Sequence, residues 1–79
     1  MKTTLDKLNI GESARIISID DSISIKRRLL DIGLIEESII TGYLKSPFND
    51  PIAYKIKNAI IAIRKIDSKK IEVEVLWKK

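Results

Sequence analysis

The stretch that decides the fold is IAYKIKNAIIAI, residues 52–63. In its first half every second side chain is large and apolar, as in a strand with one buried face: Ile52, Tyr54 and Ile56. Asn58 then suits the positive-φ position of a tight turn. On the return strand Ile61 and Ile63 continue the inner face, so the stretch predicts a β-hairpin packed on a core.

Three further segments have the composition of strands. Residues 14–19 are apolar on both faces, which indicates a strand covered by a helix or a loop. Residues 38–44 contain Gly42, which we interpret as a bulge or as a close approach of another backbone. Residues 71–75 alternate most regularly, with apolar residues facing in and two glutamates facing out.

One short helix is predicted between the first two of these strands. Residues 20–22, Asp-Asp-Ser, offer side-chain oxygens that suit a helix N-cap. The apolar residues that follow have helical spacing: Ile25, Leu29 and Ile32. Gly33 stands where a helix commonly ends in left-handed geometry. We interpret the apolar stripe as core, and residues 65–68 as one more helical turn.

The remaining segments are predicted as connections. A leucine-rich lead, residues 5–10, precedes a turn at Gly11 and the first strand. Residues 46–51 form a loop, because two prolines prevent a regular ladder of hydrogen bonds there. Asn49 in this loop is suited to left-handed geometry. Five short strands with one inserted helix make a mainly β fold, a small barrel whose sheet edges curl toward each other.

The 79 residues predict a single domain over residues 1–79, with no repeat, linker or low-complexity segment. The apolar fraction of 44% supplies a core, and the charged fraction of 33% supplies a surface. No stretch approaches the roughly 18 apolar residues that cross a bilayer, and the N-terminus lacks a signal-peptide pattern. We therefore expect a cytoplasmic protein with no direct membrane insertion.

The composition argues against an enzyme. There is no histidine to act as a base or metal ligand, and no cysteine to act as a nucleophile. The three glycines are too scattered for a phosphate-binding loop. The acidic pairs Asp20-Asp21 and Glu36-Glu37 lie in turn-like contexts that do not suit paired catalysis. We expect no catalytic residue, no cofactor and no specific metal site, since carboxylates alone bind transition metals weakly.

The charge distribution keeps nucleic acid binding open as an alternative. Residues 1–42 carry six Lys or Arg against seven Asp or Glu, whereas residues 43–79 carry nine against four. Small basic barrels bind nucleic acid with lysines and stacked aromatic side chains. The four aromatic residues are scattered, however, and Tyr54 is expected in the core. Nucleic acid is therefore the less favoured partner.

Five short stretches form an ordered set that covers nearly the whole chain: LDKLNIGESARI at 5–16, RRLLDIGL at 27–34, SPFNDPI at 46–52, AIR at 62–64 and IEV at 71–73. In this order and spacing they resemble the FeoA family, the small accessory proteins of bacterial ferrous iron transport. The second stretch is the most specific of the five. Glu36 and Glu37 depart from the Pro-Gly that the family commonly has after the helix.

The resemblance implies an SH3-like barrel that acts by docking on the cytoplasmic part of FeoB, a membrane iron transporter. An alternative is an SH3-like module related to metal-dependent repressors. A binding module needs an exposed apolar anchor with a polar rim. We predict that the helix end and the proline loop supply the anchor and the rim, and that Phe48 is the anchor. The predicted contact residues are Arg28, Leu30, Asp31, Leu34, Pro47, Phe48, Asp50 and Pro51. The sequence leaves the oligomeric state open.

Overall fold

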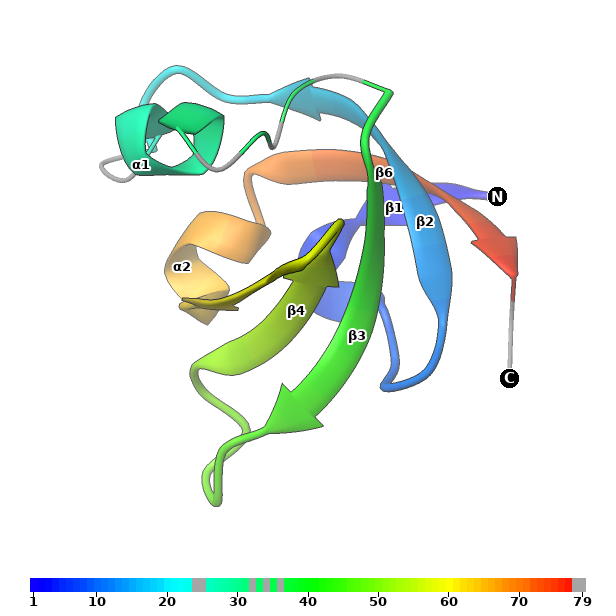
Figure 1. Cartoon of the computed structure of the whole chain (residues 1–79), viewed down its shortest axis with the longest axis vertical. Helices are drawn as coiled ribbons and strands as arrows, with labels where there is room; N and C mark the ends of the chain where they lie inside the picture. Colours follow the sequence, from blue (N-terminus) through cyan, green and yellow to red (C-terminus); the bar gives the residue numbers. More distant parts are fainter. Residues whose placement is uncertain (24–25, 32, 34, 36, 78–79) are drawn as a thin grey trace.

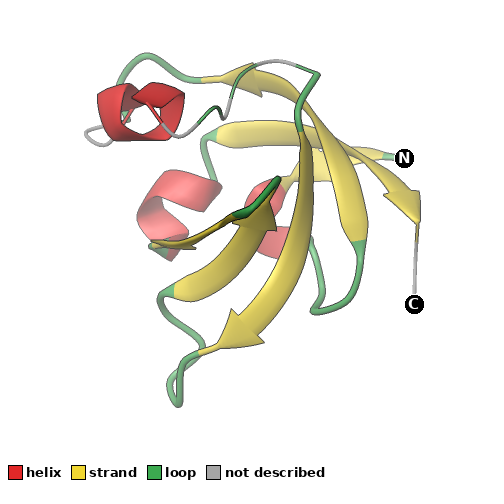
Figure 2. Cartoon of the chain, viewed as in Figure 1, coloured by secondary structure: helices red, strands yellow, loops and turns green. Residues whose placement is uncertain are grey.

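The computed structural model describes residues 1–23, 26–31, 33, 35 and 37–77. Six strands and three short helical segments follow one another along the chain (Figures 1 and 2): β1 (Lys2–Thr4), the 3-10 helix η1 (Leu5–Lys7), β2 (Ser13–Ile19), α1 (Lys26–Asp31), β3 (Ile39–Lys45), β4 (Ile52–Ile56), β5 (Ala59–Ile63), α2 (Lys65–Ser68) and β6 (Ile71–Trp77). The strands predicted at 14–19, 38–44, 52–63 and 71–75 are all present. The mainly β prediction is confirmed.

All six strands belong to one antiparallel sheet with the order β1-β6-β2-β3-β4-β5. The sheet is strongly curved, and β3 runs along most of the molecule's longest dimension (Figure 1). Register shifts in the β2–β6 and β3–β4 pairs provide this curvature, because a bulge bends a strand and increases its twist. α1 lies at one end of β3, and the loop between β3 and β4 lies at the other.

The core lies on the concave side of this sheet. Its buried residues come from nearly every element, and Tyr54 is the largest of them. The predicted inward residues Tyr54, Ile61, Ile63, Ile71 and Val73 are all buried, as is Leu29 of α1. Ile25 and Ile32, predicted to share the helical stripe with Leu29, lie outside the described residues.

Two turn residues confirm the sequence analysis and one corrects it. Gly33 has φ +91° and Asn49 has φ 63°, so both adopt the predicted left-handed geometry. In the β4–β5 turn the positive φ belongs to Lys57, at 54°, and not to Asn58. The prediction for Asn58 was wrong because this two-residue turn has positive φ at its first position alone, as type II′ turns do, and not at both positions as in type I′.

The first residues of the chain differ from the expectation of five strands. β1 pairs with β6, with Thr3 opposite Val73, and adds a sixth strand at the edge of the sheet. η1 then turns the chain so that Leu5 becomes fully buried. Three residues are too few to show an alternating pattern, so this strand forms through its partner β6 and not through its own preference.

Candidate docking surface on α1

α1 has six residues, and its two neighbouring leucines point in different directions, because successive side chains of a helix are rotated by about 100°. Leu29 is 0% exposed and belongs to the core, whereas Leu30 is 45% exposed. The helix ends where the amide of Gly33 donates to the carbonyl oxygen of Leu30 at 3.0 Å, with Gly33 in left-handed geometry. Because this end is fixed by the turn, the side chain of Leu30 has a defined place on the surface.

Leu30 lines a shallow apolar hollow. Ile19 at the end of β2 and Ile35 after α1 complete its apolar wall, and Lys26 lies at its rim, around a volume of about 370 Å³. Ile35 is itself 52% exposed. A second hollow, of about 330 Å³, is lined by Leu30 together with Lys26, Arg27 and Asp31. The side chain of Leu30 therefore borders both depressions.

The rim of this surface is cationic. Lys26, Arg27 and Arg28 occupy the first half of α1, and Arg27 and Arg28 are exposed. Lys26 forms an ion pair with Asp21, whose carboxylate is mostly exposed. An apolar centre with a charged rim is the usual composition of a protein-docking site.

The proline loop presents a different kind of surface. Phe48 is 90% exposed at its tip, beside the exposed Pro47. The loop is closed below the tip, where the amide of Asn49 donates to the carbonyl oxygen of Ser46 at 2.9 Å. The hydroxyl of Ser46 accepts from the amide of Asp50, also at 2.9 Å. These hydrogen bonds fix the loop, and its tip holds the side chain of Phe48 in solvent.

Asp50 and Pro51 hold this loop in place. The carboxylate of Asp50 accepts a hydrogen bond from the amide of Lys65, the first residue of α2, at 2.8 Å. The peptide bond between Asp50 and Pro51 is cis, and the carbonyl oxygen of Pro51 accepts from the amide of Ser46. Asp50 therefore joins the loop to α2, a contact that no local sequence pattern indicates.

The structure does not bring the two halves of the predicted surface together. α1 and the proline loop lie at opposite ends of the longest axis (Figure 1). Arg28, Leu30 and Asp31 are exposed on α1. Leu34 lies outside the described residues. Ile35 and Ile19, which the sequence analysis did not select, complete the surface at the α1 end.

The carboxylates considered for catalysis have structural contacts. Asp20 accepts a hydrogen bond from the amide of Ser22, which lowers the pKa of the carboxyl group. Arg15 donates to both carboxylate oxygens of Glu37, at 2.7 and 2.9 Å, and to Glu74 at 2.6 Å. The Arg15 hydrogen bond lowers the pKa of Glu74, and the two glutamates raise the pKa of Arg15. Glu36 lies outside the described residues.

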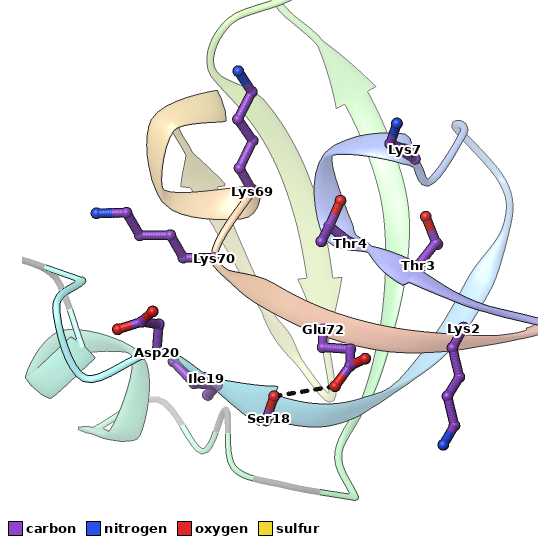
Figure 3. Close-up of a pocket in the computed structure, with 10 residues that line it drawn as sticks. All are labelled: Lys2, Thr3, Thr4, Lys7, Ser18, Ile19, Asp20, Lys69, Lys70 and Glu72. Atoms are coloured by element: carbon purple, nitrogen blue, oxygen red, sulfur yellow. Dashed lines mark hydrogen bonds between the residues drawn. The ribbon is translucent and has the colours of Figure 1, made fainter.

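A polar hollow lies on the side of β1 and α2, with a volume of about 520 Å³ (Figure 3). Four lysines line it, Lys2, Lys7, Lys69 and Lys70. Their ammonium groups point in different directions, and Lys2 extends away from the other three. The lysines therefore do not converge on one anion, and we interpret the hollow as a solvated surface.

Among residues 1–23, 26–31, 33, 35 and 37–77 no group of three or more Asp or Glu side chains is placed to hold a metal ion. No helix in the same ranges is long and apolar enough to cross a membrane.

The fold defines a class of protein, a small antiparallel β-barrel with short helices. A family model described as "FeoA domain" matches residues 3–75. The chain belongs to the FeoA domain family.

Three relatives place the chain within that family. A Porphyromonas gingivalis protein described as a fusion of Fe(2+) transport protein A and the Fe(2+) transporter FeoB is 31% identical over 72 residues, which are 91% of this chain and 8% of that protein. An FeoA-like protein of Clostridium acetobutylicum has a TM-score of 0.84 at 28% identity, over 99% of this chain and 91% of its own. FeoA of Stenotrophomonas maltophilia, described as an SH3 domain protein complexed with zinc, has a TM-score of 0.76 at 24% identity, over 91% and 89%.

The fold also occurs in metal-dependent repressors. The chain matches 42% of a manganese-dependent transcriptional repressor with a TM-score of 0.81 and 20% identity, covering 95% of itself. At this identity the likeness shows a shared fold alone. The SH3-like fold and the family are thus confirmed.

Proposed function

We propose that this chain is a cytoplasmic accessory protein of ferrous iron uptake that docks on the cytoplasmic part of a FeoB-type transporter. The docking surface is the α1 surface, defined as Ile19, Lys26, Arg27, Leu30 and Ile35. The chain contributes shape and charge to the complex and carries out no chemistry of its own.

Membership of the family supports the first part of this proposal. The Porphyromonas gingivalis relative supports the second, because there a region similar to this chain is joined to FeoB in one polypeptide. Covalent joining raises the effective concentration of two modules for each other, and is useful where the modules act together. This chain spans only 8% of that relative, so the partnership is inferred from the association of the two parts.

The observation that carries the choice of surface is the exposure of Leu30, which lines both hollows. An apolar side chain that enters a partner's pocket while its neighbours exclude water is the usual source of binding energy. Leu30 is positioned by the buried Leu29 beside it and by the turn at Gly33, so little ordering is needed when the partner binds. Arg27 and Arg28, both exposed, supply a rim that favours an acidic partner surface, whereas Lys26 is already paired with Asp21.

Phe48 is a separate candidate contact. It lies at the other end of a molecule whose longest extent is 29 Å, so a partner touching both α1 and Phe48 would have to span that length. We therefore assign the main contact to the α1 surface. Arg28 and Asp31 extend it along the helix, and Pro47 and Phe48 form a second contact only for a partner of that size.

A calorimetric titration of the chain into the purified cytoplasmic part of FeoB tests the proposal. Replacing Leu30 by Ala is expected to weaken binding at least about tenfold, as for a central anchor residue. Leu76→Ala is the matched control, because Leu76 is also a leucine, 52% exposed, on β6 away from α1. Equal binding by both variants, or no binding by the unmodified chain, would contradict the proposal.

Nucleic acid binding has weaker support. Tyr54 is fully buried and cannot stack on a base, and Phe48 and Tyr43 are exposed. Phe48 lies in the proline loop and Tyr43 on β3, so they do not form the interleaved basic and aromatic groove of single-strand binders. Binding of an oligonucleotide that weakens steeply with salt would favour this alternative.

A further inference from the structure

β5 is an edge strand without the usual protection of a sheet edge. Its five residues, Ala59–Ile63, contain no charge and no proline, and form the longest uninterrupted apolar run in the sequence. Its register with β4 is continuous from Ile52 opposite Ile63 to Ile56 opposite Ala59. The other edge strand, β1, has only three residues and carries Lys2. Natural proteins shorten, charge or bend an exposed edge, and β5 has none of these features.

The backbone of β5 presents two hydrogen-bonding residues to the open side. Ile56 and Ala59 flank a two-residue turn and form a hydrogen-bonded pair. Since such pairs alternate along an antiparallel ladder, the amide and carbonyl groups of Ile60 and Ala62 point away from β4. β5 ends the strand order, and no described strand pairs with it on that side. An extended segment lying beside β5 could form hydrogen bonds with the amide and carbonyl groups of both residues.

The side chains beside this edge are apolar. Ile60 is 54% exposed and Ala62 is exposed, both on the outer face of the sheet. The register places Ala62 beside Ala53, and Ala53 beside Leu44, in one row across three strands. Leu44 is 61% exposed. A strand added beside β5 would cover the end of this apolar row that lies on β5.

The charges around the edge indicate which occupant it fits. Lys55 lies opposite Ile60, Lys57 precedes the strand, and Arg64 and Lys65 follow it. Two acids lie near these cations and already have partners: Asp50 accepts the amide of Lys65, and Glu37, which shares a hollow with Lys55 and Lys57, is paired with Arg15. A second copy paired antiparallel, with Ile60 beside Ala62 of the other copy, would place Lys57 opposite Lys65. Self-pairing thus brings like charges together, whereas an acidic segment would neutralise them.

We infer that the edge of β5 binds an extended acidic segment of a partner protein by strand addition. Apolar residues of the segment lie beside Ile60 and Ala62, and its flanking acidic residues lie against Lys57, Arg64 and Lys65. In strand addition the main chain supplies the affinity and alternate side chains supply the specificity. This site shares no residue with the α1 surface, although the ammonium group of Lys57 lies near Gly33 at the end of α1, and it does not depend on docking there.

The test uses the full unmodified chain labelled with ¹⁵N and the synthetic peptide EDVTITVDE. Hydrogen exchange of the Ile60 and Ala62 amides is expected to slow when the peptide is added, while exchange in α1 stays unchanged. The same peptide with N-methyl groups on alternate residues loses main-chain donors and should bind about tenfold more weakly. The basic peptide KKVTITVKK should show no saturable binding, because its charges repel the flanks.

Four outcomes would overturn the inference: no saturable binding of the acidic peptide, equal binding of the N-methylated peptide, equal binding of the basic peptide, or protection located away from β5. Protection of Ile60 and Ala62 that rises with protein concentration alone would also overturn it, in favour of a second copy.

As an independent check, Ile60→Asp should reduce peptide binding more than the matched outer-face variant Leu44→Asp. Failure of the FeoB titration would leave each of these results unaffected.

Discussion

Gly42 lies against the backbone of Asn9 so closely that a Cβ atom on Gly42 would be 2.6 Å from the Asn9 carbonyl oxygen. Two hydrogen bonds hold this approach in place. The amide of Gly11 donates to the carbonyl oxygen of Gly42 at 2.9 Å. The amide of Gly42 donates to the carbonyl oxygen of Glu12 at 3.0 Å. The contact joins the lead segment to the middle of β3, where the bulge begins.

We predict that Gly42→Ala destabilises the fold by about 1–3 kcal/mol, because the contacted atoms are backbone and cannot move aside without straining both segments. Denaturant unfolding followed by circular dichroism measures the change. A neutral effect would mean that the lead segment is not held against β3.

The two leucines of α1 are predicted to differ in their effect on stability. Leu29→Ala should cost about 2–5 kcal/mol, because it removes a fully buried side chain and leaves a cavity. Leu30→Ala should change the free energy of unfolding by less than about 0.5 kcal/mol, as at other exposed sites. Thermal and denaturant unfolding of the two variants compare them, and similar losses would contradict the assigned orientation of the helix.

The hydroxyl of Tyr54 is predicted to make the fold sensitive to alkaline pH. Burial raises the pKa of this hydroxyl from 10.0 to about 12, and the hydroxyl donates to the carbonyl oxygen of Leu5 at 3.4 Å. Because the folded-state pKa is raised, the native state holds the proton more tightly, and stability falls as pH rises from 10 toward 12. Tyr54→Phe should remove this fall, at a cost near neutral pH of about 1 kcal/mol for the lost hydrogen bond.

Arg15 is predicted to make the fold sensitive to acid. The hydrogen bond from Arg15 lowers the pKa of Glu74 below the ordinary 4.5. The ionised Glu74 therefore stabilises the fold fully above pH 4.5, and this contribution is lost as the pH falls below 4.5. Arg15→Gln should lower stability at neutral pH and flatten this acid dependence. Arg27→Gln, on exposed α1, is the control and should leave the profile unchanged. An unchanged profile in both variants would show that the contact contributes nothing.

The sequence predicted those elements whose pattern is local. The hairpin at 52–63 and the strand at 71–75 alternate clearly, and Gly42 and Asn49 were recognised from residue type. β1 was missed because it forms only by pairing with β6. The positive φ at Lys57 was assigned to Asn58, since residue preference alone does not decide which turn position is left-handed.

The predicted docking surface shows a second limit. Leu30 and Phe48 were grouped because the helix end and the proline loop were expected to form one contact surface, but α1 and the proline loop lie at opposite ends of the longest axis. Ile19 and Ile35 join Leu30 only because the end of β2 and the turn after α1 meet there. Such neighbours lie far apart in the sequence and have no shared pattern that would reveal them.

The most direct test of the central claim maps the FeoB contact on the unmodified chain. In a titration of ¹⁵N-labelled protein with the cytoplasmic part of FeoB, amide signals around Leu30 and Ile19 should shift or broaden first. Signals around Leu76 should stay unchanged. Saturable binding whose effects leave the α1 surface untouched, or no binding at all, would contradict the account.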